Sequence, residues 1–472
     1  MEKTKQGNRF LKNTAIFFVG TVLSKLVSFL MLPLYTSKVP SEQMGIFDVS
    51  VTLVTMVFSV CYFEIWSAVL RYLYSKENSE NQAGVIKSGW KIFGLSTIVF
   101  IAVSILMCGV MGYDYAYLII GYGIACALSN QITFIARGLG LNAAFSVSGI
   151  INTLVHLSLN VLLLTVFQMD YSALYISYIV GVLAQAVYLG ICILKKKSIN
   201  EPSDKTANSK LAVDMFKYAL PLCLNTVSYW LLTSFNRVVF NNIFGNSASG
   251  IFSIGNKFGS IIALVTTCFT YAWQDLAFSN TTDDDMEKNS ALYTGACHKY
   301  QLFLVASTTM LLPFVKIIFP ILVKGDYSDA LSLVPSFILV AVISGYSAFI
   351  GNVFYAIKNT KIISISTIIS AVFNLMICYP LIKYFGGNGT NIATILAFVV
   401  NIAIRAIILR KKTNFDIKIM SILVGCVWIA ATVWMYYSGN IIGQIITLVL
   451  NVGISLVVFR NDIAGFLVRK KK

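Results

Sequence analysis

The stretch TAIFFVGTVLSKLVSFLMLPLYT, residues 14–36, decides the fold class of this chain. At 1.5 Å per residue it is long enough to cross about 30 Å of hydrocarbon as a helix, and its single charge is Lys25. Further apolar stretches of similar length follow near 45–68, 90–111, 116–137, 147–168, 172–194, 216–240, 249–278, 299–322, 333–357, 362–383, 389–409, 419–437 and 441–459. We therefore predict an all-α polytopic membrane protein with 14 transmembrane helices.

Composition excludes several other classes of protein. Of the 472 residues, 57% are hydrophobic and 12% are charged, too few charges for a soluble globule of this size. There is no GxxxxGK[ST], HExxH or GxSxG motif, so we expect no ATP-driven pump and no enzyme. The nine cysteines lack metal-ligand spacing, which favours neither a metal site nor a disulfide framework, and we expect no cofactor.

The formal net charge of +16 is explained by where the cations lie rather than by nucleic acid. With the predicted spans crossing the bilayer in alternate directions, most Lys and Arg residues fall in loops and ends on one side. These segments are 3–12, 71–91, 195–217, 358–361, 410–418 and 460–472. Only Lys38, Lys316, Lys324 and Lys383 fall at or near the other side. The positive-inside rule then places both termini in the cytoplasm of a multi-pass protein of the cytoplasmic (inner) membrane.

A polar linker and a short repeat suggest two lobes. The linker KKKSINEPSDKTANSKLAVD, 195–214, separates the first six spans from the rest. SEQMGIFD at 41–48 and NSASGIFS at 246–253 place Gly-Ile-Phe before the second and eighth spans, as expected of a duplication. Six spans per copy give parallel repeats related by a pseudo-two-fold axis along the membrane normal. We predict an N-terminal lobe (1–194), a cytoplasmic linker (195–215), a C-terminal lobe (216–412) and two extra helices with a basic tail (413–472).

Three cations inside the spans are the candidates for binding an anion. A charge at mid-bilayer costs about 2.5–3.5 kcal/mol on insertion scales, so its retention suggests a function. Lys25 lies near the middle of the first span, Arg237 near the outer end of the seventh and Lys257 in the outer half of the eighth. For Lys25 the alternative is a structural pair with Glu64, and Arg237 can reach the interface by snorkelling.

Further polar residues are candidates for the cavity or for ion coupling. Glu64 and Asp275 are embedded acids, and buried acids can relay protons. Arg71 ends the second span, where it either anchors the helix or guards a cytoplasmic mouth. Arg405 lies one turn from the cytoplasmic end of the twelfth span, which favours an interface anchor.

The start of the chain resembles a polysaccharide-transport flippase. The resemblance rests on 12–14, SKLVSF at 24–29, LPLY at 32–35, and Glu42 with GIFD at 45–48. It continues at Phe235-Asn236-Arg237, at GIFS (250–253) with Lys257, and at Ala272-Trp273. That family handles O-antigen or capsule repeat units within the multidrug, oligosaccharidyl-lipid and polysaccharide exporter superfamily.

The resemblance implies two six-helix lobes around a cavity that opens alternately to each side. The implied substrate is an oligosaccharide linked through pyrophosphate to undecaprenol, moved to the outer leaflet for surface polysaccharide biosynthesis, with a polymerase and glycosyltransferases as possible partners. Lys25, Arg237 and Lys257 match positions where such flippases carry cationic cavity residues. Family members often carry an acid where this chain has Asn236, which leaves the coupling ion open.

Two other functions remain at this point. A cation-coupled multidrug antiporter of the same superfamily would need a mid-membrane carboxylate, and the first and seventh spans contain no Asp or Glu. A non-transporting scaffold of a glycan-assembly complex would not need buried cations.

Overall fold

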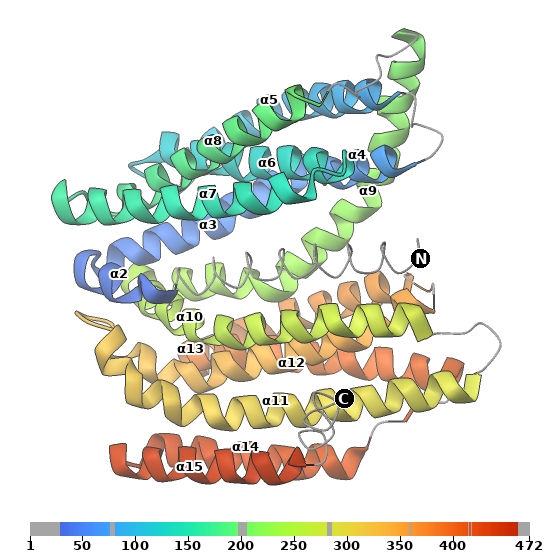
Figure 1. Ribbon diagram of the computed structural model, residues 1–472. Helices are drawn as coiled ribbons and strands as arrows, with labels where there is room; N and C mark the ends of the chain where they lie inside the picture. The colour runs from blue at the N-terminus through green and yellow to red at the C-terminus, as the bar shows by residue number, and fades with distance from the viewer. Residues whose placement is uncertain are drawn as a thin grey trace. The chain divides into compact units, whose positions relative to one another are not determined.

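The computed structural model describes residues 29–75, 81–196, 205–280, 286–357, 359, 361–413, 415–416 and 418–460. Within these residues the regular elements are helices (Figure 1). They are α2 (Leu32–Lys38), α3 (Ser41–Cys61), α4 (Ile65–Tyr74), α5 (Gln82–Met111), α6 (Ala116–Gly138), α7 (Asn142–Val161) with a π-helical end (Leu162–Val166), α8 (Ser172–Leu194), α9 (Lys205–Thr233), α10 (Phe235–Asn280), α11 (Met286–Leu322), α12 (Ala330–Ala356), α13 (Lys361–Thr413), α14 (Ile419–Ser438) and α15 (Ile441–Val458). The predicted all-α class is confirmed.

In the part of the chain that the structure describes, eleven helical segments are long and apolar enough to cross a membrane. Two of them span 57 and 53 residues, far more than one crossing needs. Each contains a glycine with non-helical backbone, Gly245 in α10 and Gly386 in α13, where two helices join. Glycine suits both positions because φ is positive there, 81° and 55°. The predicted count of 14 spans stays a prediction, since much of the first predicted span lies outside the described residues.

The second predicted span is broken rather than continuous. α3 ends at Cys61 and α4 begins at Ile65, and between them Phe63 and Glu64 have φ values of 52° and 57°. Left-handed backbone at a residue with a Cβ costs about 1–2 kcal/mol. The sequence carries no glycine or proline at this break, so its hydropathy predicted one helix over 45–68.

The chain divides into two compact units, residues 1–250 and 251–472. In the first unit α8 packs between α6 and α7, and α9 packs along α3, α4 and α5 (Figure 1). Fully buried Asn160 joins three helices of this unit, because it donates to Tyr35 Oη (3.1 Å) and accepts from Ser177 Oγ (2.9 Å). Such interhelical hydrogen bonds satisfy polar groups that the bilayer would leave unpaired.

The second unit is built around α11, α12 and α13. α12 packs on α13, and α11 packs on α14 and α15 (Figure 1). The last two helices thus belong to this unit through α11, and their predicted place outside a repeat stays a prediction. The predicted lobe boundary in the 195–215 linker stays a prediction.

Candidate functional site

Arg237 forms an ion pair with Asp48. Arg237 lies in the first turn of α10, directly after Asn236, and its Nη1 lies 3.3 Å from Asp48 Oδ1 and 3.5 Å from Oδ2. Both side chains are about one-fifth exposed, 22% and 20%. One guanidinium nitrogen serves both carboxylate oxygens, so the geometry is not the two-nitrogen fork of a strong Arg–carboxylate pair. Sequence reasoning missed Asp48 as the partner, although a carboxylate four residues into a predicted span was a visible signal.

One turn before Asp48, α3 touches the start of the second half of α10, backbone against backbone. A Cβ at Gly45 would lie 1.8 Å from the carbonyl oxygen of Asn246, and a Cβ at Gly250 would lie 1.9 Å from that of Ser41. The hydroxyls of Ser41 and Ser247 are 2.8 Å apart. We call this the α3–α10 contact. It joins the two copies of the Gly-Ile-Phe repeat at their glycines, and only glycine permits it.

Glu64 lies at the break between α3 and α4. Its Oε1 accepts a hydrogen bond from Thr226 of α9 (3.1 Å), and its Oε2 accepts one from Ser67 (3.1 Å). The carboxylate thus links the broken span to α9 through hydroxyl groups. Arg71, in the last turn of α4, is exposed.

The remaining predicted site residues are placed less completely. Lys257 is an exposed residue of α10 in the second unit, whereas Arg237 belongs to the first. Asn236 is buried, with 1% exposure. The backbone of Asp275 lies in α10. Lys25 lies outside the described residues. The common cavity of Lys25, Arg237 and Lys257 therefore stays a prediction.

Arg405 is a buried cation in the second unit, with 6% exposure, and not the interface anchor that its sequence position suggested. Its Nη1 donates to the carbonyl oxygen of Ser347 in α12 (2.7 Å) and its Nε donates to Ser366 Oγ (2.9 Å). Its Nη2 donates to Thr367 Oγ1 (3.3 Å) and to the Ile363 carbonyl oxygen (3.4 Å). The guanidinium thus ties α12 to both halves of α13.

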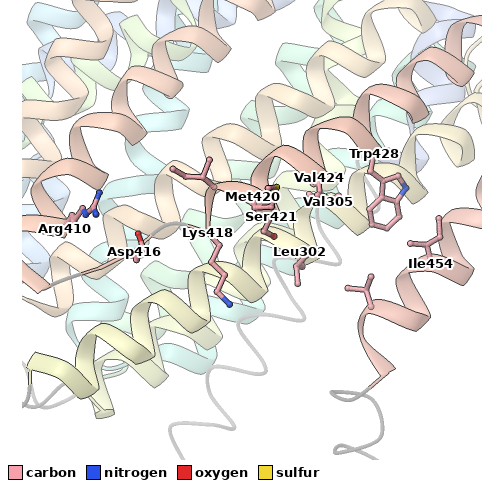
Figure 2. Close-up of a pocket in the computed structure, with 13 residues that line it drawn as sticks. Leu302, Val305, Arg410, Asp416, Lys418, Met420, Ser421, Val424, Trp428 and Ile454 are labelled. Carbon is pink, nitrogen blue, oxygen red and sulfur yellow. The ribbon is translucent and has the colours of Figure 1, made fainter.

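A groove of about 960 Å³ lies between α11, α14 and α15 in the second unit. Apolar residues line most of it, among them Leu302, Val305, Trp428 and Ile454 (Figure 2). Arg410, Asp416 and Lys418 lie at one end (Figure 2). The groove thus has apolar walls, with two cations and one carboxylate at one end.

The fold is that of known multi-pass membrane transporters. The chain is similar to the lipid II flippase MurJ in an inward closed conformation, with a TM-score of 0.67 and 15% identity over 95% of this chain and 100% of that one. It is also similar to a multidrug resistance MATE family transporter of the MOP superfamily. Its inward-facing conformation gives a TM-score of 0.60 and 14% identity over 89% of this chain and 100% of that one. Its outward-facing conformation gives a TM-score of 0.55 and 15% identity over 89% of this chain and 95% of that one.

Sequence comparison then gives the family. Residues 10–273, more than half of the chain, match the family described as polysaccharide biosynthesis protein, and the chain belongs to that family. No curated protein sequence matches. The resemblance drawn from the GIF repeats, Arg237 and Lys257 is thereby confirmed at the level of family and superfamily fold.

Proposed function

We propose that this protein is a flippase that moves undecaprenyl-pyrophosphate-linked oligosaccharides from the cytoplasmic to the outer leaflet for surface polysaccharide biosynthesis. The observation that carries the proposal is a partly exposed guanidinium, Arg237, in a polysaccharide-biosynthesis chain with the fold of a lipid flippase. In this proposal glycosyltransferases assemble the substrate and a polymerase uses it, since their class follows from its chemistry.

The charge of the substrate explains why cations belong here. A pyrophosphate linkage carries about two negative charges, and moving them through hydrocarbon without partners is prohibitive. Lys25, Arg237 and Lys257 are proposed to offset this cost along the path of the pyrophosphate. Arginine matches phosphate oxygens with two parallel donors, and lysine acts as a mobile point charge.

The other polar residues predicted from the sequence have secondary roles in this proposal. Glu64, which already links the broken span to α9, is proposed as a proton or cation coupling site. Asn236, Arg71 and Asp275 are proposed to contribute polarity to the cavity or its mouths. The orientation that goes with this function has both termini in the cytoplasm and the chain in the inner membrane.

The test is transfer of a fluorescent undecaprenyl-pyrophosphate oligosaccharide across proteoliposomes. We expect wild-type protein to transfer it, Lys25→Ala to slow transfer about tenfold or more, and Lys25→Arg to retain most of it, because only the latter keeps the charge. Equal rates for wild type and Lys25→Ala would remove Lys25 from the anion path. Folded wild-type protein that transfers nothing would refute the flippase.

A cation-coupled multidrug antiporter is the second candidate, and one observation favours it. Glu64 is a carboxylate at a broken membrane helix with hydroxyl partners, and such breaks bind coupling cations in several transporters. This function predicts dye efflux driven by a proton or Na⁺ gradient and abolished by Glu64→Gln. Efflux that persists in Glu64→Gln would exclude Glu64 as the coupling group.

A further inference from the structure

The Asp48–Arg237 ion pair and the α3–α10 contact involve the same two pieces of chain. Asp48 lies three residues after Gly45, so both occupy neighbouring turns on one side of α3. Arg237 lies in the first turn of α10, and Gly250 follows on the same helix beyond the Gly245 break. All four residues belong to the first unit. Any movement of α3 away from α10 at Gly45 therefore also strains the ion pair.

The α3–α10 contact is made by backbone atoms rather than by interlocking side chains. Glycines bring two backbones together without side chains that interlock, and each atom pair contributes only about 0.1–0.2 kcal/mol of dispersion energy. One hydroxyl pair, Ser41 and Ser247, adds a hydrogen bond. The charge pair one turn away adds a further link between α3 and α10.

The ion pair is also open to competition. A single Arg237 nitrogen faces Asp48, at 3.3 Å, and both side chains are partly exposed to solvent. A pair in which one nitrogen faces the carboxylate is weaker than a two-nitrogen fork. A pyrophosphate group brings more negative charge and can engage the guanidinium through two parallel hydrogen bonds. It can therefore compete with Asp48 for the guanidinium.

We propose that Asp48 stands in for the substrate's anion. Asp48 pairs with Arg237 while the α3–α10 contact is closed. When a pyrophosphate binds Arg237 in place of Asp48, the contact opens. This inference rests on the proposed function, because it assumes that Arg237 meets the anion. Asp48 is a positioning residue in this scheme. It couples occupancy of the anion site to separation of α3 from α10, and it keeps the contact closed in the absence of substrate.

Disulfide trapping at the contact measures its closure directly. Ser41→Cys and Ser247→Cys place two thiols where hydroxyls are 2.8 Å apart, in a background whose nine native cysteines are replaced. A protease site inserted in the linker between residues 197 and 204 separates the two positions, so that only the disulfide holds the fragments together on a non-reducing gel. The rate of oxidative cross-linking then reports how often the contact is closed.

The probes are inorganic pyrophosphate and undecaprenyl pyrophosphate, added to the full-length protein in vesicles. With Asp48 present we expect either probe to slow cross-linking about fivefold or more, a typical coupling between sites. Asp48→Asn should cross-link slowly without any anion and respond little to the probes. Asp48→Glu should behave as the parent does. Asp170→Asn is the matched control, because it removes another half-buried carboxylate of the same unit and should leave the rate unchanged.

The outcomes separate this inference from the proposed function. Cross-linking of Asp48→Asn at the parent rate, with the same response to both probes, would overturn the role of Asp48. So would a parent protein whose cross-linking ignores both probes. Lipid-linked oligosaccharide transfer is measured in the same vesicles before oxidation. If pyrophosphate slows cross-linking in a protein that transfers no lipid-linked oligosaccharide, the proposed role of Asp48 is supported and the flippase function is refuted.

Discussion

Arg405 shows what a buried cation requires of its neighbours. Its Nη1 would lie 2.8 Å from a Cβ at Gly351, so the α12 backbone is open at this point to admit the guanidinium. Ser347, one turn earlier, supplies both a carbonyl and a hydroxyl acceptor. Sequence position alone, one turn from a basic cluster, indicated an interface anchor. The burial depends on which helices pack around α13, and hydropathy does not encode that.

Gly351→Ala is expected to destabilise the second unit. The added methyl group must displace the guanidinium or the α12 backbone, and overpacking of this kind costs about 1–3 kcal/mol. The measurement is thermal unfolding of the purified protein in detergent, compared with Gly94→Ala, where a Cβ meets nothing within 4 Å. An unfolding temperature for Gly351→Ala that equals the Gly94→Ala value would show that Arg405 does not occupy this position.

Among the helices, the last two complete hydrogen bonds that prolines leave open. Pro313 in α11 has no N–H for the carbonyl of Thr309, and Asn451 Nδ2 of α15 donates to that oxygen instead (2.7 Å). Pro335 in α12 likewise leaves the Leu331 carbonyl without its partner, and Tyr436 Oη of α14 donates to it (2.9 Å). Membrane helices tolerate proline when a neighbour satisfies the freed carbonyl.

A double-mutant cycle tests this pairing of helices. Asn451→Leu should cost about 1–3 kcal/mol in the parent, because it leaves the buried Thr309 carbonyl unpaired. In a Pro313→Ala background the helix supplies its own N–H to Thr309, so the same change should cost clearly less. Thermal unfolding of the four proteins gives the coupling energy. Additive effects of the two substitutions would mean that Asn451 does not compensate for Pro313.

At the scale of the whole molecule, the helical class and the family could be read from hydropathy and short motifs. Span length is set by bilayer thickness, and the GIF repeats mark equivalent helix starts. The partners of the charges could not be read. Asp48 and Arg237 are far apart in sequence, and their pairing follows from a helix approach that two glycines allow. The break at Phe63 and Glu64 was also hidden, because neither residue type signals left-handed backbone.

The membrane topology of the whole chain can be tested with reporter fusions. Reporter fusions within 197–204 and after residue 472 should be active in the cytoplasm, and a fusion within 112–115 should be active outside, because basic loops are retained on the cytoplasmic side. Replacing Lys195, Lys196 and Lys197 by Gln removes positive charge from the linker at 195–214, and this variant is the control for the effect of loop charge on orientation. Outside activity of the 197–204 fusion in the parent would reverse the proposed orientation and the direction of transport with it.

The proline-linked hydrogen bonds have a consequence for biogenesis. Thr309 and Asn451 are 142 positions apart, so at about 5–20 residues per second the ribosome needs about 7–28 s to deliver the donor after the acceptor. During that interval the nascent α11 carries an open carbonyl at membrane depth, where insertion machinery and membrane proteases act. A chain that terminates before α15 would keep that defect permanently. α15 and α14 thus supply the donors for carbonyl oxygens of α11 and α12 only after the rest of the unit has been synthesised.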